Sequence, residues 1–353
     1  MERQSNIELL RLVVMFFVLI LHTNYLSIGE PNFNNVSLVE FVVRNFIESF
    51  NFIAVIVFVL ISGFFSIRLT KKSITNYLFI ILFYSVGLRF LWLIGSFLFN
   101  YEFNIPYFIE SFFFLSNSSW FVLDYLMLML FSPMLNMFAE QSSKRSLLIT
   151  IILILFASTW FGILGDYGLF GCDRGYSTLA EYKNGFSFLT FMTIYLIGRY
   201  LKLHYEDNPE RSLTIKQCVV GFCFWGGVSL IFSLIVSYVG KGASVIYTYS
   251  NPVFIFTAVF FFLLFRKIRV SSKLINKLAV STFAVYLVHS NPVIIYKYID
   301  YFKFLYANNS FVMYLIYVVV SCLLIYAVSI LLDQLRLYLY KKYILVIVEN
   351  NKS

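Results

Sequence analysis

Long apolar runs separated by short polar segments dominate the chain. Residues 12–21 and 151–156 are apolar at every position, so they lack the alternation of a half-buried strand. A run of about 20 apolar residues crosses a bilayer core as a helix, in which the backbone groups are satisfied within the segment. We therefore predict an all-α, polytopic integral membrane protein with about ten transmembrane helices. The predicted spans are residues 7–28, 47–67, 76–98, 120–138, 146–165, 186–203, 217–239, 251–267, 278–298 and 311–332.

The positions of the basic residues give these helices a direction. Of the 27 Lys and Arg residues, 19 fall in one alternating set of connecting segments and 6 in the other, while Arg11 and Arg89 lie inside spans. Cytoplasmic loops are enriched in Lys and Arg, so both termini are predicted to be cytoplasmic and the chain to lie in the bacterial inner membrane. We expect one membrane domain, residues 1–340, then a short cytoplasmic tail, residues 341–353, and no separate soluble domain.

Composition narrows the classes of function. Hydrophobic residues make up 60% of the chain and charged residues only 13%, which is typical of a protein surrounded by the lipid bilayer. The net charge of +9 comes from residues at the ends of apolar runs and not from one basic face, so we expect no nucleic-acid partner. The 4 cysteines form no CxxC pair, and we expect no metal site.

Arg11 and His22 lie on one face of the first predicted span. Eleven steps of ~100° bring the helix ~20° past three full turns, and the two residues are ~16 Å apart along the axis. Histidine suits proton transfer from a hydroxyl near neutral pH, and a guanidinium binds phosphate bidentately. The pair indicates a general base, His22, and a site for a phosphate-containing acyl donor, Arg11. The simpler alternatives are an Arg11–Glu8 ion pair or an interfacial Arg11, and a structural hydrogen bond from His22.

Four segments, in order along nearly the whole chain, resemble the membrane acyltransferase-3 family. They are Arg11 and His22 with ten residues between them, residues 58–64 (FVLISGF), residues 120–125 (WFVLDY) through Ser132 and Pro133, and residues 281–289 (STFAVYLVH). The resemblance implies an O-acyltransferase, a transferase of groups other than aminoacyl groups. It implies an acyl-CoA donor, usually acetyl-CoA, on the cytoplasmic side, and an acceptor hydroxyl on an extracytoplasmic polysaccharide or its lipid-linked precursor. His22 would then be a general base or an acyl carrier.

Further candidates follow the same segments. Arg68, Lys71 and Lys72 stand where the family often has several arginines, and we predict that they help to bind the donor; the alternative is a positive-inside signal alone. His289 lies in the ninth predicted span at a depth near that of His22. There it would orient His22, contact the acceptor or bond a neighbouring helix.

The remaining candidates are predicted to support the substrate site. Asp124 and Arg89 are expected to pair between helices, and Ser62 either lets helices approach closely or lines the site. Trp120 and Tyr125 belong to the aromatic segment of the resemblance.

Two other classes of membrane protein remain open. A glycan polymerase or flippase should carry a large basic outer loop, whereas only 6 of the 27 basic residues fall on the predicted outer side. A small-molecule transporter built from duplicated halves should show broken helices in matching positions. The chain has 6 prolines and no internal repeat, which favours the acyltransferase.

Overall fold

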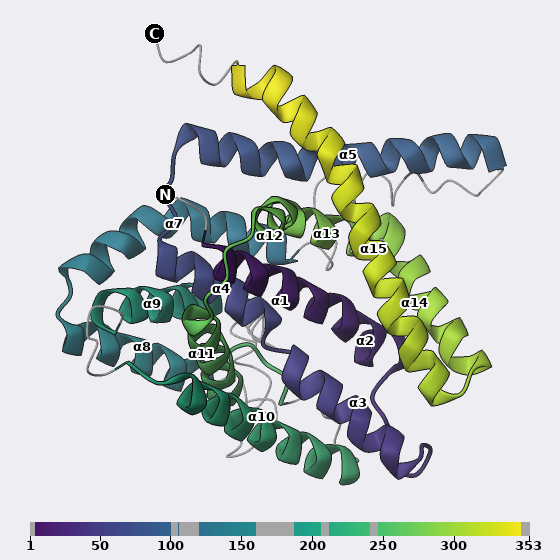
Figure 1. The fold of residues 1–353 in the computed structure, drawn as a ribbon, viewed down its shortest axis with the longest axis horizontal. Helices are drawn as coiled ribbons and strands as arrows, with labels where there is room; N and C mark the ends of the chain where they lie inside the picture. Colours follow the sequence, from purple (N-terminus) through teal and green to yellow (C-terminus); the bar gives the residue numbers. More distant parts are fainter. Residues whose placement is uncertain are drawn as a thin grey trace.

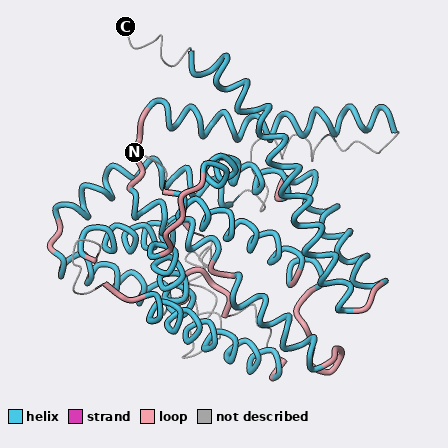
Figure 2. Tube along the Cα trace, in the orientation of Figure 1, coloured by secondary structure: helices cyan, strands magenta, loops and turns pink. Residues whose placement is uncertain are grey.

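The computed structural model describes residues 4–99, 105, 120–159, 187–205, 212–240 and 246–346, and this part of the chain is helical without strands (Figures 1 and 2). The first helices are α1 (Ser5–Thr23), α2 (Tyr25–Ile28), α3 (Leu38–Asn51), α4 (Ala54–Phe65), α5 (Lys71–Phe99), α7 (Trp120–Gln141) and α8 (Lys144–Thr159). The later helices are α9 (Phe188–His204), α10 (Ile215–Tyr238), α11 (Pro252–Lys267), α12 (Lys273–Leu278), α13 (Thr282–His289), α14 (Pro292–Asn308) and α15 (Phe311–Leu339).

Each of the ten predicted spans overlaps one or more of these helices, and residues 160–165 of the fifth span and residue 186 of the sixth lie outside the described residues. Six helical stretches in the described part are long and apolar enough to cross a membrane, or seven if a bent pair forms one span. The helices α8, α9 and α11 have only 16 or 17 residues. The chain is therefore an integral membrane protein built from helices, and the count of ten and the sides of the termini stay predictions. The last helix continues through a π-helical turn, Tyr340–Ile344, into the segment predicted to be a tail.

Helix α1 lies in the middle of the molecule (Figure 1) and contacts α2, α3, α4, α11, α12, α13, α14 and α15. Three tyrosines from α14 and α15 donate hydrogen bonds to its backbone carbonyls. The bonds run from Tyr326 to Leu12 at 3.3 Å, from Tyr298 to Leu19 at 2.7 Å and from Tyr314 to Thr23 at 2.6 Å. Away from water each phenolic hydroxyl needs such an acceptor, so these bonds fix α14 and α15 along α1.

Two glycines let α4 and α9 cross with their backbones in contact. A Cβ atom on Gly63 would lie 2.2 Å from the carbonyl oxygen of Tyr195, and one on Gly198 would lie 2.6 Å from that of Leu60. Small residues give membrane helices this close approach, which van der Waals contact then stabilises. The Ser-Gly-Phe segment at residues 62–64 is therefore an interface with α9, and Phe64 at its end is 2% exposed.

The predicted ninth span, residues 278–298, is not one straight helix. A 3₁₀ turn, Ala279–Ser281, leads into α13, which ends at His289, and α14 begins at Pro292 after a bend of 80°. The side chain of Asn291 accepts a hydrogen bond from the Val293 N–H at 3.1 Å, and proline follows at the first helical position. This Asn-Pro pair is a helix start signal, and it overrides the continuous apolar pattern on which the prediction rested.

Enlarging Gly63 tests the crossing of α4 and α9. We expect Gly63→Ala to lower the free energy of unfolding by about 1–3 kcal/mol, because its methyl group forces the two backbones apart. Gly227→Ala in α10 is the control, since a Cβ atom there meets no atom within 4 Å and alanine favours a helix. The measurement is thermal unfolding in detergent. A Gly63→Ala protein that melts at or above the wild-type temperature would contradict this packing.

Candidate functional site

His22 and His289 meet inside the helix bundle. His289 Nε2 lies 3.1 Å from His22 Nδ1, and the ring centroids are 5.1 Å apart. His22 comes from the last turn of α1 and His289 from the last turn of α13, and α13 packs directly against α1. His289 is 1% exposed, whereas His22 is half-buried.

The hydrogen bonds of His289 determine which nitrogen of His22 is left for chemistry. His289 Nδ1 lies 2.7 Å from the carbonyl oxygen of Val285, which only accepts, so Nδ1 carries the hydrogen. In a neutral ring Nε2 is then an acceptor, and burial disfavours the charged ring. His22 Nδ1 therefore donates to His289 Nε2. The second nitrogen, His22 Nε2, keeps its lone pair and makes no hydrogen bond within the described residues.

Arg11 lies toward the N-terminal end of the same face of α1. Its Nη1 is 3.3 Å from Glu8 Oε1, and the side chain of Arg11 keeps 35% of its surface exposed. Residues 5–23 form one helix, so the spacing of eleven residues keeps Arg11 and His22 on one face. The ion pair with Glu8 is present, and Arg11 remains accessible enough to bind a further group.

Aromatic contacts connect the segments that carry the predicted motifs. The Ser62 hydroxyl bonds the Tyr125 hydroxyl at 2.9 Å. Tyr125 stacks on Phe121, and Phe121 contacts Tyr286 with ring centroids 5.1 Å apart. Tyr286 lies against His289. The segments at residues 62–64, 120–125 and 281–289 are therefore joined by a continuous series of side-chain contacts that ends at His289.

Other predicted residues lie farther from the pair or have different partners. Trp120 stacks on Tyr249. Arg89 is 1% exposed and donates to the carbonyl of Ser85 at 3.1 Å. No ion pair joins Arg89 to Asp124 among the described residues, so the predicted pair is not formed.

The basic residues after α4 are exposed. Arg68 lies in the connection between α4 and α5, and Lys71 and Lys72 are the first two residues of α5. Within the described residues no group of three or more His, Cys, Asp or Glu side chains is placed to hold a metal ion.

A polar network that the sequence did not predict surrounds the break between α1 and α2. Asn24 donates to Glu48 Oε2 at 2.9 Å and accepts from Arg44 Nε at 3.2 Å, and Arg44 also pairs with Glu40 at 3.5 Å. Arg44 is one of the 6 basic residues that the charge count assigned to the outer connecting segments. It is instead buried in α3, because this helix begins at Leu38 and the guanidinium has these partners. Glu40, Arg44 and Glu48 follow one another at a spacing of four residues, which places their side chains on one face of a helix. This spacing was the feature of the sequence that could have predicted the network.

The same network continues into the loop before α11. Tyr25 donates to Asn45 Oδ1 at 2.8 Å, and Tyr247 donates to Ser233 at 2.8 Å. Burial raises the pKa of the Tyr247 phenol well above its usual value, so its hydroxyl stays protonated and remains a donor. These bonds hold the region beyond His22 in a fixed shape.

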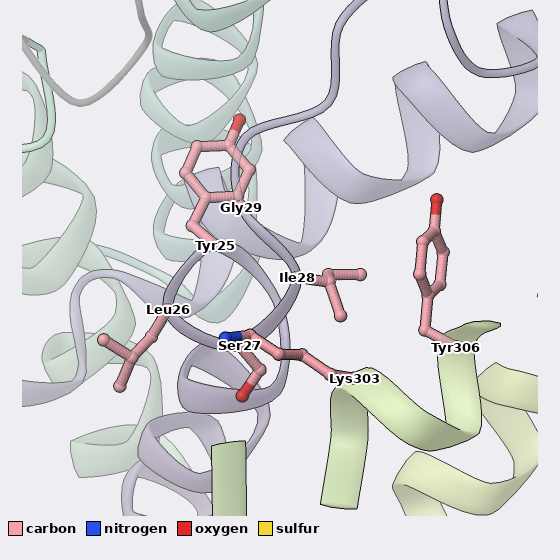
Figure 3. A pocket seen from close by; sticks show the side chains of 7 residues that line it. All are labelled: Tyr25, Leu26, Ser27, Ile28, Gly29, Lys303 and Tyr306. Carbon is pink, nitrogen blue, oxygen red and sulfur yellow. The ribbon is translucent and has the colours of Figure 1, made fainter. Parts of the chain in front are cut away.

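A hollow of about 470 Å³ opens beside this network (Figure 3). It is lined by residues 25–29 at one side and by Lys303 and Tyr306 of α14 at the other. Figure 3 shows Lys303 extending from α14 toward the turn that carries Ser27. The Ser27 hydroxyl donates to the backbone carbonyl of His22 at 2.5 Å, which ties the wall of the hollow to the residue that carries the candidate base.

Comparison with known proteins identifies one family. A family model described as an acyltransferase domain, acyltransferase-3, matches residues 4–333, nearly the whole chain. The search of curated proteins and the search of solved structures each found no match. The family favours acyl transfer over the polymerase, flippase and transporter alternatives.

Removing Asn24 tests the network next to His22. We expect Asn24→Ala to lower the free energy of unfolding by about 1–3 kcal/mol, because Arg44 and Glu48 each lose a buried hydrogen bond. The matched control is Asn308→Ala, whose exposed amide bonds only the nearby Phe304 carbonyl. Thermal unfolding in detergent measures both. Equal melting temperatures for the two variants would show that the network contributes nothing to stability.

Proposed function

The chain belongs to the acyltransferase-3 family, and from this premise we propose that it is an O-acetyltransferase of the bacterial inner membrane. It would take the acetyl group from cytoplasmic acetyl-CoA and transfer it to a hydroxyl of an extracytoplasmic polysaccharide or its lipid-linked precursor. The observation that carries the proposal is the unbonded Nε2 atom of His22, oriented through His289, on the helix face that also bears Arg11.

The proposed orientation places the N-terminal end of α1 at the cytoplasm. The uneven distribution of Lys and Arg between alternating segments supports it. Acetyl-CoA would then approach past Arg11, whose guanidinium attracts phosphate, and the acceptor would approach from the other side. The hollow between α2 and α14 supports this second route, because tyrosine rings and a lysine suit a sugar that carries phosphate or other negative charge.

In the proposed reaction His22 Nε2 accepts the proton of the acceptor hydroxyl while that oxygen attacks the thioester carbonyl carbon. The carbon–sulfur bond breaks, and the thiolate of CoA takes the proton from the imidazolium. The products are an O-acetyl ester and free CoA, and His22 returns to its neutral form. His289 accepts the Nδ1–H of His22 throughout, which stabilises the transient positive charge.

An acyl-histidine intermediate uses the same nitrogen atom. His22 Nε2 would attack the thioester itself, release CoA and pass the acetyl group to the acceptor in a second step. Radiolabelled acetyl-CoA without acceptor separates the two routes. Label that stays on wild-type protein but not on His22→Ala indicates the covalent route, and unlabelled protein indicates direct transfer.

Removing the base tests the function. We expect His22→Ala to lower acetyl transfer by at least about 10²-fold, the usual contribution of a positioned base. Membranes with equal amounts of inserted protein receive labelled acetyl-CoA, and label is counted in the polysaccharide and lipid-linked glycan fractions. Gln334→Ala, an exposed change on α15, is the control. Near-normal transfer by His22→Ala, or no glycan change when the gene is deleted, would refute the proposal.

Two substitutions of His289 test its positioning role. The Oε1 atom of Gln can replace Nε2 as acceptor for His22, whereas Asn can replace only Nδ1 and its bond to Val285. We expect His289→Gln to keep kcat within about tenfold of wild type and His289→Asn to lose more, with the KM for acetyl-CoA unchanged in both. Equal kcat values for Gln and Asn would leave His289 with a packing role alone.

A further inference from the structure

The hollow beside α2 has two walls that come from distant parts of the chain. Residues 25–29 form the first wall, and Lys303 and Tyr306 of α14 form the second (Figure 3). Its volume of about 470 Å³ falls within the range of roughly 300–1,000 Å³ found for sites that hold a small molecule. The hollow is therefore large enough to hold a sugar residue.

The buried side chain of Arg44 joins the two walls. Its Nη2 atom donates a hydrogen bond to the backbone carbonyl of Gly29 in the first wall. Its guanidinium carbon lies 5.5 Å from the centroid of the Tyr306 ring in the second wall. The Tyr306 hydroxyl donates to Glu40, which also pairs with Arg44 at 3.5 Å. A buried ion pair thus holds both walls, so the fold itself sets the shape of the hollow.

The hollow contains one charge that no described residue neutralises. Arg44 lies behind the walls and pairs with Glu40, and the described residues that line the hollow include no acidic side chain. Lys303 is exposed and forms no ion pair or hydrogen bond within the described part of the chain. Asp300 stands one helical turn earlier on α14 and does not pair with it, and Glu30 follows the first wall without lining the hollow. The ammonium group of Lys303 is therefore available to an anion from outside the protein.

Both walls are attached to the end of α1 that carries the candidate base. Ser27 of the first wall lies five residues after His22, and its hydroxyl bonds the backbone carbonyl of His22. Helix α14, which carries the second wall, is attached through Tyr298, whose hydroxyl donates to the Leu19 carbonyl at 2.7 Å. A molecule in the hollow therefore lies beside the last turn of α1.

We propose that Lys303 binds an anionic group of the acceptor, so that the protein selects sugars with a phosphate or carboxylate close to the hydroxyl that is acetylated. The role of the bound sugar as acceptor rests on the proposed function. Lysine attracts either group as a point charge and does not require the bidentate geometry of an arginine contact. The other described residues that line the hollow are uncharged, so the preference for a charged sugar depends on this one side chain.

Protection of Lys303 from an amine-reactive ester tests binding without any acetyl transfer. Purified full-length protein in neutral detergent is labelled with glucose 1-phosphate, glucuronate or methyl glucoside present, and mass spectrometry measures the label on each lysine. We expect the two anionic sugars to half-protect Lys303 at a concentration about tenfold lower than the neutral glucoside, the contribution of one charge-assisted contact. Lys297 is the internal control, because it is exposed on the same helix and does not line the hollow.

The labelling experiment can overturn the proposal in three ways. Charged and neutral sugars that protect Lys303 equally would show that its charge gives no preference. No protection by any of the three sugars would show that the hollow is not a sugar site. Protection by phosphatidylglycerol in the micelles, with none by glucose 1-phosphate, would show that Lys303 binds a lipid headgroup instead.

Substitution of Lys303 tests the same contact during transfer to the glycan of native membranes. At saturating acetyl-CoA we expect Lys303→Gln to lower the transfer rate about tenfold with the KM for acetyl-CoA unchanged, and Lys303→Arg to stay within about twofold of wild type. Added salt should slow wild type more than Lys303→Gln, because salt screens this exposed contact. The matched control is Lys297→Gln, which removes the same charge from α14 and should keep both the rate and the salt dependence. Thermal unfolding shows whether each variant is folded.

The two experiments separate this proposal from the proposed function. A folded Lys303→Gln protein that transfers acetyl groups at the wild-type rate, with the wild-type salt dependence, overturns the anion contact and leaves the acetyltransferase standing. Anionic sugars that protect Lys303 in a protein that acetylates no glycan support the anion contact and refute the acetyltransferase alone.

Discussion

The hydrogen bond between His22 and His289 sets the positions of three helices. A ring nitrogen in a dry helix bundle needs a partner, because an unsatisfied polar group has no water to bind. The partner of His22 comes from the end of α13, and directly after His289 the chain turns through a bend of 80°. Helix α14 then runs along α1, where Tyr298 bonds the Leu19 carbonyl. The same contact occupies Nδ1 of His22 and leaves Nε2 as the nitrogen without a hydrogen bond among the described residues.

The requirement that buried polar groups have partners also explains the polar residues elsewhere in the bundle. Asp333 is fully buried and accepts two bonds of 2.8 Å from Arg336 and one of 2.9 Å from Tyr84. Near the histidines, Asn24 bonds both Arg44 and Glu48. In each case a charge is buried together with its opposite or with a strong donor, which offsets part of the cost of desolvation. These groups fix the helices around α1 in one arrangement.

The local features of the site could be predicted from the sequence, and its contacts between helices mostly could not. The helical period alone places Arg11 and His22 on one face, and span direction alone brings His289 to a similar depth. The contact with His22 depends on the bend after α13, which the pattern of apolar residues concealed although Asn291 and Pro292 signalled it. The predicted ion pair between Asp124 and Arg89 is not found among the described residues for a related reason. The depth of a residue in the membrane does not determine which neighbouring helix its side chain contacts.

The two ends of α1 differ in chemistry, and in the proposed function this difference would let one nitrogen atom serve two substrates. Toward the N-terminal end lie Arg11 and the Arg266 guanidinium, and toward the other end lie tyrosine hydroxyls and the hollow lined by Lys303 and Tyr306. Under the proposed orientation, the donor and the acceptor reach His22 from opposite ends and need not exchange places within the bundle. In the proposed function α1 would connect the two compartments, and only the acetyl group would need to pass along it.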